Sequence, residues 1–146
     1  FVGTAVRERL IDPETSIQIG IRTHAPDTCG IRILYGYDVE EMSAGEIADA
    51  IVHHVGDRAT YLTFDIDCLD PAFAPGTGTP EPGGLSSAQV LSLLEELCAM
   101  QLPFVGMDCV EVSPPYDHAE LTSNIAALCV WTYLCARLAS EKTVSP

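Results

Sequence analysis

Short apolar segments that favour β-strands alternate along this chain with longer segments of helical periodicity. Residues 60–65 (TYLTFD) and 103–112 (PFVGMDCVEV) are rich in β-branched and aromatic side chains, as buried strands usually are. Between them, residues 86–100 place Val90 and Leu94 at helical spacing. This alternation predicts an α/β fold in which parallel strands are joined by helices.

The remaining segments extend the same pattern. Residues 16–22 (SIQIGIR) alternate isoleucine with other residues and predict a strand, and residues 31–35 predict a second, shorter strand. Helices are expected over residues 43–56 and 86–100, because each begins with a serine followed three residues later by Glu or Gln, a capping box. A last helix is expected over about residues 122–140. The chain has 146 residues and no internal repeat, so we expect one domain or part of one.

Charge and cysteine content limit the function classes. Seven Lys and Arg against 21 Asp and Glu give a net charge of −14, which argues against nucleic acid and anionic membranes as partners. No apolar run reaches the length of a membrane span. Six cysteines occur without a CxxC pair, so we expect reduced thiols and a cytoplasmic location. The first ten residues contain neither a starting Met nor an apolar signal core, which predicts an internal piece of a longer chain.

Acidic residues gather where two of the predicted strands end. The first strand ends in Asp65-Ile66-Asp67, with Asp70 close behind, and the second ends in Glu111. In extended geometry Asp65 and Asp67 would point to one face, about 6 to 7 Å apart. Two carboxylates brought within about 4 Å would repel by about 4 kcal/mol at an effective dielectric of about 20. A divalent cation would neutralise them, although a solvated loop start explains the bare DxD tripeptide equally well.

Two other DxD-bearing classes fit the following residues poorly. An EF-hand loop starting at Asp65 would need Gly at its sixth position and Glu at its twelfth, where Asp70 and Gly76 stand. Phosphotransferases of the haloacid dehalogenase class follow an apolar strand with DxDx(T/V), whereas Leu69 and Pro71 follow here. The residues after the DxD tripeptide must therefore show which class of protein this chain belongs to.

That loop, from Thr63 to Leu85 (TFDIDCLDPAFAPGTGTPEPGGL), resembles the third signature of the ureohydrolases, the family of arginases and agmatinases. The segments LIDP, QIGIR, VGMD and EVSPPYDHAEL around it look most like those of agmatinases. The resemblance covers nearly all of this chain but only the carboxyl-terminal half of the family's chain. We therefore expect residues 1–146 to be the carboxyl-terminal part of a single ureohydrolase domain, a three-layer α/β/α fold with a mainly parallel sheet.

The resemblance implies a binuclear manganese site and a guanidino substrate. Asp65 and Asp67 match two carboxylate ligands of Mn²⁺, and Glu111 matches the glutamate that pairs with the substrate guanidinium. Thr79 matches a threonine of the substrate pocket, and His24 follows a strand at the end that faces this pocket. In the family's mechanism a hydroxide bridging two Mn²⁺ ions attacks the guanidinium carbon, which releases urea and an amine.

The chain also departs from the family pattern. The histidine-bearing GGDH and DAHxD motifs, which complete the six metal ligands, do not occur here, so this chain alone should lack a complete metal site and be inactive. Asp70 is expected to cap the turn before Pro71, a structural role that we favour over metal ligation. Ala25 stands where arginases carry an acid for the substrate's α-amino group, which fits a substrate without that group.

The sequence thus predicts an agmatinase-like ureohydrolase that hydrolyses agmatine to putrescine and urea. A guanidinobutyrase, or another hydrolase of guanidino acids, is the close alternative. A catalytically inactive fragment that serves as an assembly or interaction partner is the alternative of another class. By resemblance, the partners are a small guanidino molecule and further copies of the chain in a trimer or hexamer, with no nucleic acid and no membrane.

Overall fold

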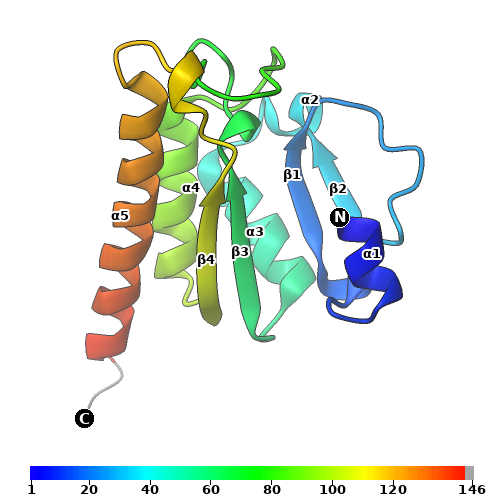
Figure 1. Cartoon of the computed structure of the whole chain (residues 1–146). Coiled ribbons are helices and arrows are strands. Elements are labelled where there is room, and N and C mark those ends of the chain that lie inside the picture. The colour runs from blue at the N-terminus through cyan, green and yellow to red at the C-terminus, as the bar shows by residue number, and fades with distance from the viewer. Residues whose placement is uncertain (144–146) are drawn as a thin grey trace.

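The structure is a computed structural model that describes residues 1–143, with side chains through residue 139 (Figure 1). Its strands are the parallel elements of an α/β fold, as the sequence predicts, and all four run in one direction. In chain order the elements are α1 (Val2–Arg7), η1 (Pro13–Thr15), β1 (Ile17–Ile21), β2 (Arg32–Tyr35), α2 (Gly36–Val39), α3 (Ala44–Val55), β3 (Thr60–Asp65), η2 (Ile66–Cys68), α4 (Ser87–Ala99), β4 (Phe104–Val110), η3 (Pro114–Tyr116) and α5 (Leu121–Thr143), where η marks a short 3₁₀ turn.

The two central helices begin at the capping boxes that the sequence predicts. At the start of α3 the Ser43 N–H donates to the Glu46 carboxylate at 2.8 Å, and the Glu46 N–H donates back to the Ser43 hydroxyl at 3.3 Å. Ser86 and Gln89 make the same reciprocal pair at the start of α4. These bonds satisfy backbone donors that the first helical turn leaves free, which fixes where each helix starts.

The four strands form two separate parallel pairs. β1 pairs with β2, and β3 pairs with β4 with Asp65 opposite Val110, but no ladder joins the pairs within residues 1–143. The strands lie in the order β4, β3, β1, β2 across Figure 1, with their carboxyl ends at the top. The alternation suggests a single continuous sheet. The structure instead has two separate strand pairs, and the facing edges of β1 and β3 have no hydrogen-bonded neighbour in the described chain.

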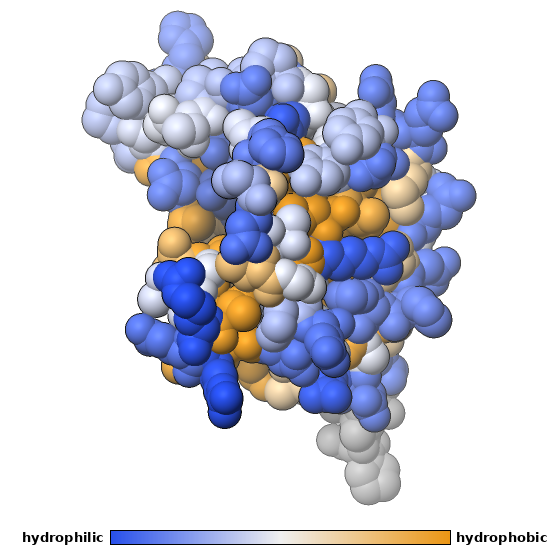
Figure 2. Space-filling model, turned by 90° about the vertical axis from the view of Figure 1, so that its right-hand side faces the viewer, coloured by the Kyte–Doolittle hydropathy of each residue, from blue (hydrophilic) through white to orange (hydrophobic). Residues whose placement is uncertain are grey.

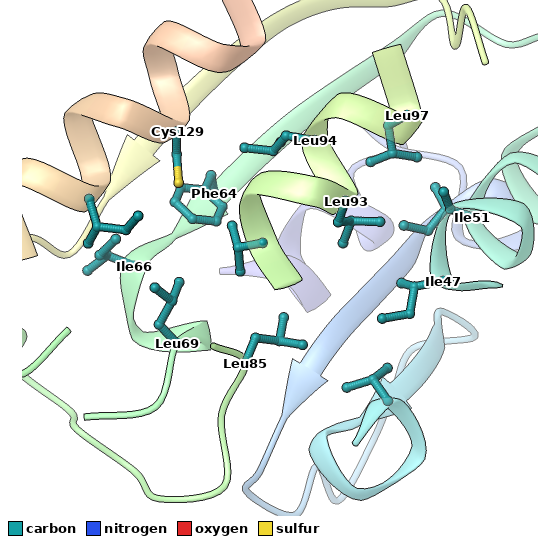
Figure 3. Close-up of a cluster of buried hydrophobic side chains, with 14 of the residues drawn as sticks. Ile47, Ile51, Phe64, Ile66, Leu69, Leu85, Leu93, Leu94, Leu97 and Cys129 are labelled. Carbon is teal, nitrogen blue, oxygen red and sulfur yellow. The ribbon is translucent and has the colours of Figure 1, made fainter. Parts of the chain in front are cut away.

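One hydrophobic core nevertheless joins the two strand pairs. Helix α3 packs on α4, and α4 packs on α5. Phe64 of β3 lies in this core, and Ile19 of β1 packs against it from the other pair. Figure 3 shows much of the cluster, to which Ile47, Ile51, Ile66, Leu69, Leu85, Leu93, Leu94, Leu97 and Cys129 contribute.

Parts of the strands and of the surface remain apolar and exposed. Tyr61 of β3 is 57% exposed and Val105 of β4 is 64% exposed, although parallel strands are usually covered on both faces. Figure 2 shows apolar surface among polar side chains on the side where α1 and β2 lie. Phe1, Leu10 and Ile11 are the exposed apolar residues of α1 and the segment around it.

Helix α5 is half core and half surface. Tyr133 is buried and meets the ring of Phe104 edge to face at 5.6 Å, whereas Trp131 and Leu134 are exposed. The stretch Leu121–Ala139 is apolar and long enough to cross a membrane by length and composition alone, a test that core helices of globular proteins also pass. Because one side of α5 packs on α4 and β4, packing within the fold accounts for part of that apolar character.

Candidate functional site

The shared direction of β3 and β4 brings their acidic ends to one edge. Asp65 is the last residue of β3, and Glu111 directly follows Val110, its neighbour across the ladder. The pKa of the Asp65 carboxyl is raised above its ordinary value, first by burial and then by the negative charges of Asp67 and Glu111. The parallel pairing of β3 and β4 therefore places the strand ends that carry Asp65 and Glu111 at one edge of the sheet.

Asp67 does not continue the strand, contrary to the extended geometry expected from the sequence. The Asp65 carboxylate accepts the Asp67 N–H at 3.1 Å, which turns the chain into the 3₁₀ turn η2. The expected placement of both side chains on one strand face is thus wrong, because this local bond competes with strand continuation. The Thr79 hydroxyl donates to the Asp67 carboxylate at 2.7 Å, so the fold does bring these two candidates together.

Asp70 has the structural role that the sequence favours. One of its carboxylate oxygens accepts the Ala72 N–H at 2.9 Å and the other accepts the Gly83 N–H at 2.8 Å. These backbone donors lower the pKa of the Asp70 carboxyl. Asp70 therefore holds the two ends of the Pro- and Gly-rich loop (residues 66–84) together and has its oxygens committed to the backbone.

Gly84 closes the same loop where no side chain fits. A Cβ at this position would lie 2.5 Å from the Asp70 backbone nitrogen and 2.5 Å from the Leu69 carbonyl carbon. At Gly78, in the same loop, a Cβ would meet nothing within 4 Å. The contrast offers a matched pair of substitutions.

Gly84→Ala is expected to destabilise the fold, whereas Gly78→Ala should not. The added methyl group forces backbone apart at position 84, and overpacking of this kind costs about 1–3 kcal/mol or more. The measurement is the free energy of unfolding of both variants in urea. Equal stability of the two variants would show that the loop yields at Gly84 without cost.

Asp117 ties the end of the site region to α5. Its carboxylate accepts the N–H groups of Thr122 and Ser123 at 2.9 and 2.8 Å, and the Thr122 hydroxyl accepts the Gly76 N–H at 2.7 Å. Desolvation raises the pKa of Asp117, but the Ser123 hydroxyl and these backbone donors outweigh it and lower the pKa to about 2. Asp117 is thus a helix-capping residue, and Thr122 at the same helix start anchors loop 66–84 at Gly76.

Glu111 has an unusual backbone conformation. Its φ of 66° lies in the left-handed region, which costs an L-residue other than Gly about 1–2 kcal/mol. Val112, the next residue, forms a bridge with Thr77 of loop 66–84, so the chain is held on both sides of Glu111. Strained residues of this kind concentrate at functional sites, and the Glu111 side chain is exposed at the strand edge that carries Asp65.

In the described part of the chain, the structure shows no bond between His24 and the acidic residues of the site. It lies exposed on the loop after β1, and among the described side chains it makes no hydrogen bond or ion pair. Its assignment to the substrate pocket therefore stays a prediction.

Arg22, also after β1, is a residue of the site region that the sequence reasoning missed. Its guanidinium donates to the Gly20 carbonyl at 2.7 Å, to the Asp67 carbonyl, and to the Glu81 carbonyl at 3.1 and 3.3 Å. An arginine at the carboxyl end of a strand, beside acidic strand ends, is the only sequence signal that points to it.

The residues present fit part of a metal site. Carboxylate oxygens suit Mn²⁺ and Mg²⁺, and the pKa of Asp65 is raised first by burial and then by the charges of Asp67 and Glu111, both of which a bound cation would offset. Residues 1–139 hold no group of three or more His, Cys, Asp or Glu side chains arranged to bind a metal ion. Burial raises the pKa of the Cys68 thiol, which follows Asp67 in the chain. The described chain thus offers two carboxylates and would need further ligands.

Comparison with known proteins shows which family this chain resembles. The sequence model of the arginase family matches residues 1–135. An agmatinase of Escherichia coli is 50% identical over 124 residues, which are 85% of this chain and 40% of the relative. The crystal structure of a hypothetical agmatinase from Burkholderia thailandensis superposes with a TM-score of 0.92 at 47% identity, covering 97% of this chain and 44% of that chain.

A further solved structure broadens the range of related activities. The proclavaminate amidino hydrolase of Streptomyces clavuligerus is similar with a TM-score of 0.82 and 45% identity, over 91% of this chain and 46% of that chain. This chain therefore spans less than half the length of each of these three relatives.

Proposed function

The chain belongs to the arginase family, and from that premise we propose that it carries part of the active site of an agmatinase-like ureohydrolase. The reaction is the hydrolysis of agmatine to putrescine and urea. The observation that carries this proposal is the meeting of Asp65, Asp67 and Glu111 at one strand edge. The 50% identity to an agmatinase supports agmatine as the first substrate to test.

The proposed substrate requires an anion that faces solvent at the site, and Glu111 supplies it. A guanidinium is planar and cationic, and a carboxylate can bind it through two parallel hydrogen bonds. The Glu111 side chain is exposed, and bonds on either side of its backbone hold it in place. Thr79 acts differently, because its hydroxyl is donated to the Asp67 carboxylate and so orients that carboxylate. We assign substrate binding to Glu111 and place Thr79 at the pocket wall.

The proposed cofactor is Mn²⁺, held by Asp65 and Asp67 together with ligands outside the described residues. When bound, manganese supplies Lewis-acid activation of water and offsets the negative charge of the cluster. The Asp65 carboxylate keeps the η2 turn closed through the Asp67 N–H, so the two candidate ligands are held in one short segment. A homo-oligomer, which the family resemblance implies, and a cytoplasmic location, which the cysteine pattern suggests, remain predictions.

A guanidino acid is the second candidate substrate. The 45% identity to a proclavaminate amidino hydrolase favours it, since that relative is named for a different amidino substrate. The alternative of another class is an inactive chain that acts only as an assembly partner. One experiment separates the three.

The experiment uses a chimera in which this chain replaces the matching 40% of the Escherichia coli agmatinase. We expect the chimera with Mn²⁺ to release urea from agmatine faster than from 4-guanidinobutyrate or arginine. The chain of 146 residues alone, with its two candidate ligands, is the control and should release none. A folded chimera that prefers 4-guanidinobutyrate would support the second candidate, and one inactive on all substrates would support the assembly partner.

A further inference from the structure

We propose that Arg22 is a positioning residue that fixes the backbone of Asp67 from the neighbouring strand pair. The inference deepens the proposed function, since it concerns a residue that we place at the metal site. Arg22 directly follows β1, whereas Asp67 follows β3, and no strand ladder joins these two pairs in the described chain. Arg22 would thus fix the relation between the two pairs at the edge where the candidate site lies.

All the hydrogen bonds of the Arg22 guanidinium go to backbone carbonyls. It donates to Gly20 on its own strand and reaches across to Asp67 in η2 and Glu81 in loop 66–84. Among the described residues, none of these bonds goes to a carboxylate. Arg22 therefore holds the backbone at Asp67 without occupying the carboxylate oxygens of Asp65 or Asp67, whose hydrogen-bond partners are the Asp67 N–H and the Thr79 hydroxyl.

The shape of the guanidinium explains why arginine stands here. Its donors are fixed in one plane, so a single side chain can hold three carbonyls from separate segments in a set geometry. A lysine ammonium is a point charge on a flexible stem and does not reproduce that fork. The geometry therefore makes Arg22→Lys an informative partial replacement.

The stem of Arg22 is confined as well. A Cβ at Gly36, the residue after β2, would lie 3.2 Å from both Cγ and Cδ of Arg22 and 2.8 Å from the Gly83 carbonyl oxygen. The segment after β2 thus packs closely on the stem and on loop 66–84. Gly36 therefore confines one side of the stem, whose head reaches the Asp67 carbonyl.

The expected role follows from these contacts. Without Arg22 the carbonyls of Asp67 and Glu81 lose their donor, and η2 is free to move relative to β1. The fold should survive, because the core that joins the strand pairs contains no part of Arg22. The loss should instead appear as a mobile loop 66–84 and as a weaker metal site.

The first test is hydrogen exchange on the 146-residue chain without metal. We expect Arg22→Met to raise amide exchange within residues 66–84 and to leave exchange in α3 and α4 unchanged. Arg22→Lys should give an intermediate effect. Arg32→Met, an exposed position on β2, is the matched control and should match wild type. Wild-type exchange of residues 66–84 in Arg22→Met would overturn the proposal, as would a general rise across the chain in both Arg22 variants.

The second test is Mn²⁺ binding by the chimera with the same substitutions. Changes to groups that orient metal ligands cost about 10–100-fold in affinity, so Arg22→Met should raise the Kd for Mn²⁺ by that factor. Arg22→Lys should raise the Kd for Mn²⁺ by a smaller factor, and Arg32→Met should leave this Kd unchanged. An unchanged Kd in Arg22→Met overturns the proposal. A chimera that releases no urea while its loop and its Kd respond as expected would sink the proposed function and leave the role of Arg22 standing.

Discussion

Replacing Asp65 or Asp67 with alanine in the chimera is expected to abolish urea release and to leave the fold intact. Each substitution removes one of the two carboxylates that we assign to Mn²⁺. Changes that only reorient a metal ligand cost about 10–100-fold, so removal of a ligand should cost more than about a hundredfold in metal affinity or turnover. Metal content by mass spectrometry and urea release under saturating agmatine measure the two effects.

The fold should tolerate these substitutions for a reason that the structure supplies. The pKa of Asp65 is raised, which means that the ionised carboxylate is less stable in the folded chain than in the unfolded chain. Its cost to stability is present above the folded pKa and disappears as the pH falls below the ordinary value. Asp65→Ala removes that cost at neutral pH, although it also frees the Asp67 N–H.

Asp57→Ala, at an exposed turn between α3 and β3, is the matched control for loss of an acid. It should keep both the metal content and the activity of the parent chimera. Normal manganese content in Asp65→Ala and Asp67→Ala alike would contradict the assignment of both residues as ligands.

Helix positions could be predicted well because their determinants are local. Ser43 with Glu46 and Ser86 with Gln89 specify the starts of α3 and α4 within four residues of sequence, and the structure begins both helices there. Gly56 ends α3 as local sequence also suggests, with a positive φ of 68° that glycine adopts without steric cost.

Strand pairing could be predicted only in part, since it depends on residues far apart in the chain. The parallel direction followed from the helical crossovers, but nothing in residues 16–22 or 60–65 indicates that these segments do not pair with each other. Two short elements, α1 and α2, were also missed, because Val2–Arg7 and Gly36–Val39 are too short to show helical periodicity.

The candidate site could likewise be predicted where local sequence and strand direction determine it, and not where single bonds between distant residues do. Asp65 and Glu111 could be placed at one edge because parallel strands end together, and the register of β3 and β4 puts Asp65 opposite Val110, the residue before Glu111. The bend at Asp67 was missed because one side chain to backbone bond decides it. Arg22 was missed for a deeper reason: two of its partners, Asp67 and Glu81, are 45 and 59 positions away and offer only their carbonyls, so their residue types carry no signal.

Glu111→Gln is expected to keep manganese in the chimera and to lose most of the affinity for agmatine. A neutral amide cannot form the charged pair with guanidinium, and a hydrogen bond to a charged group contributes about 1.5–3 kcal/mol. The loss should therefore appear in KM, with the metal content unchanged. Loss of manganese with an unchanged KM would make Glu111 a metal ligand and would contradict the substrate role.

Glu120 provides the control that separates charge from backbone strain. It is also an exposed glutamate with a positive φ, 58° against 66° at Glu111. Gly relieves left-handed strain at either position, so Glu111→Gly and Glu120→Gly should both retain or raise the Tm. Only Glu111→Gly should also lose agmatine binding. If the two glycine variants behave alike in both Tm and KM, the strained backbone at Glu111 is a feature of the loop and has no tie to the substrate.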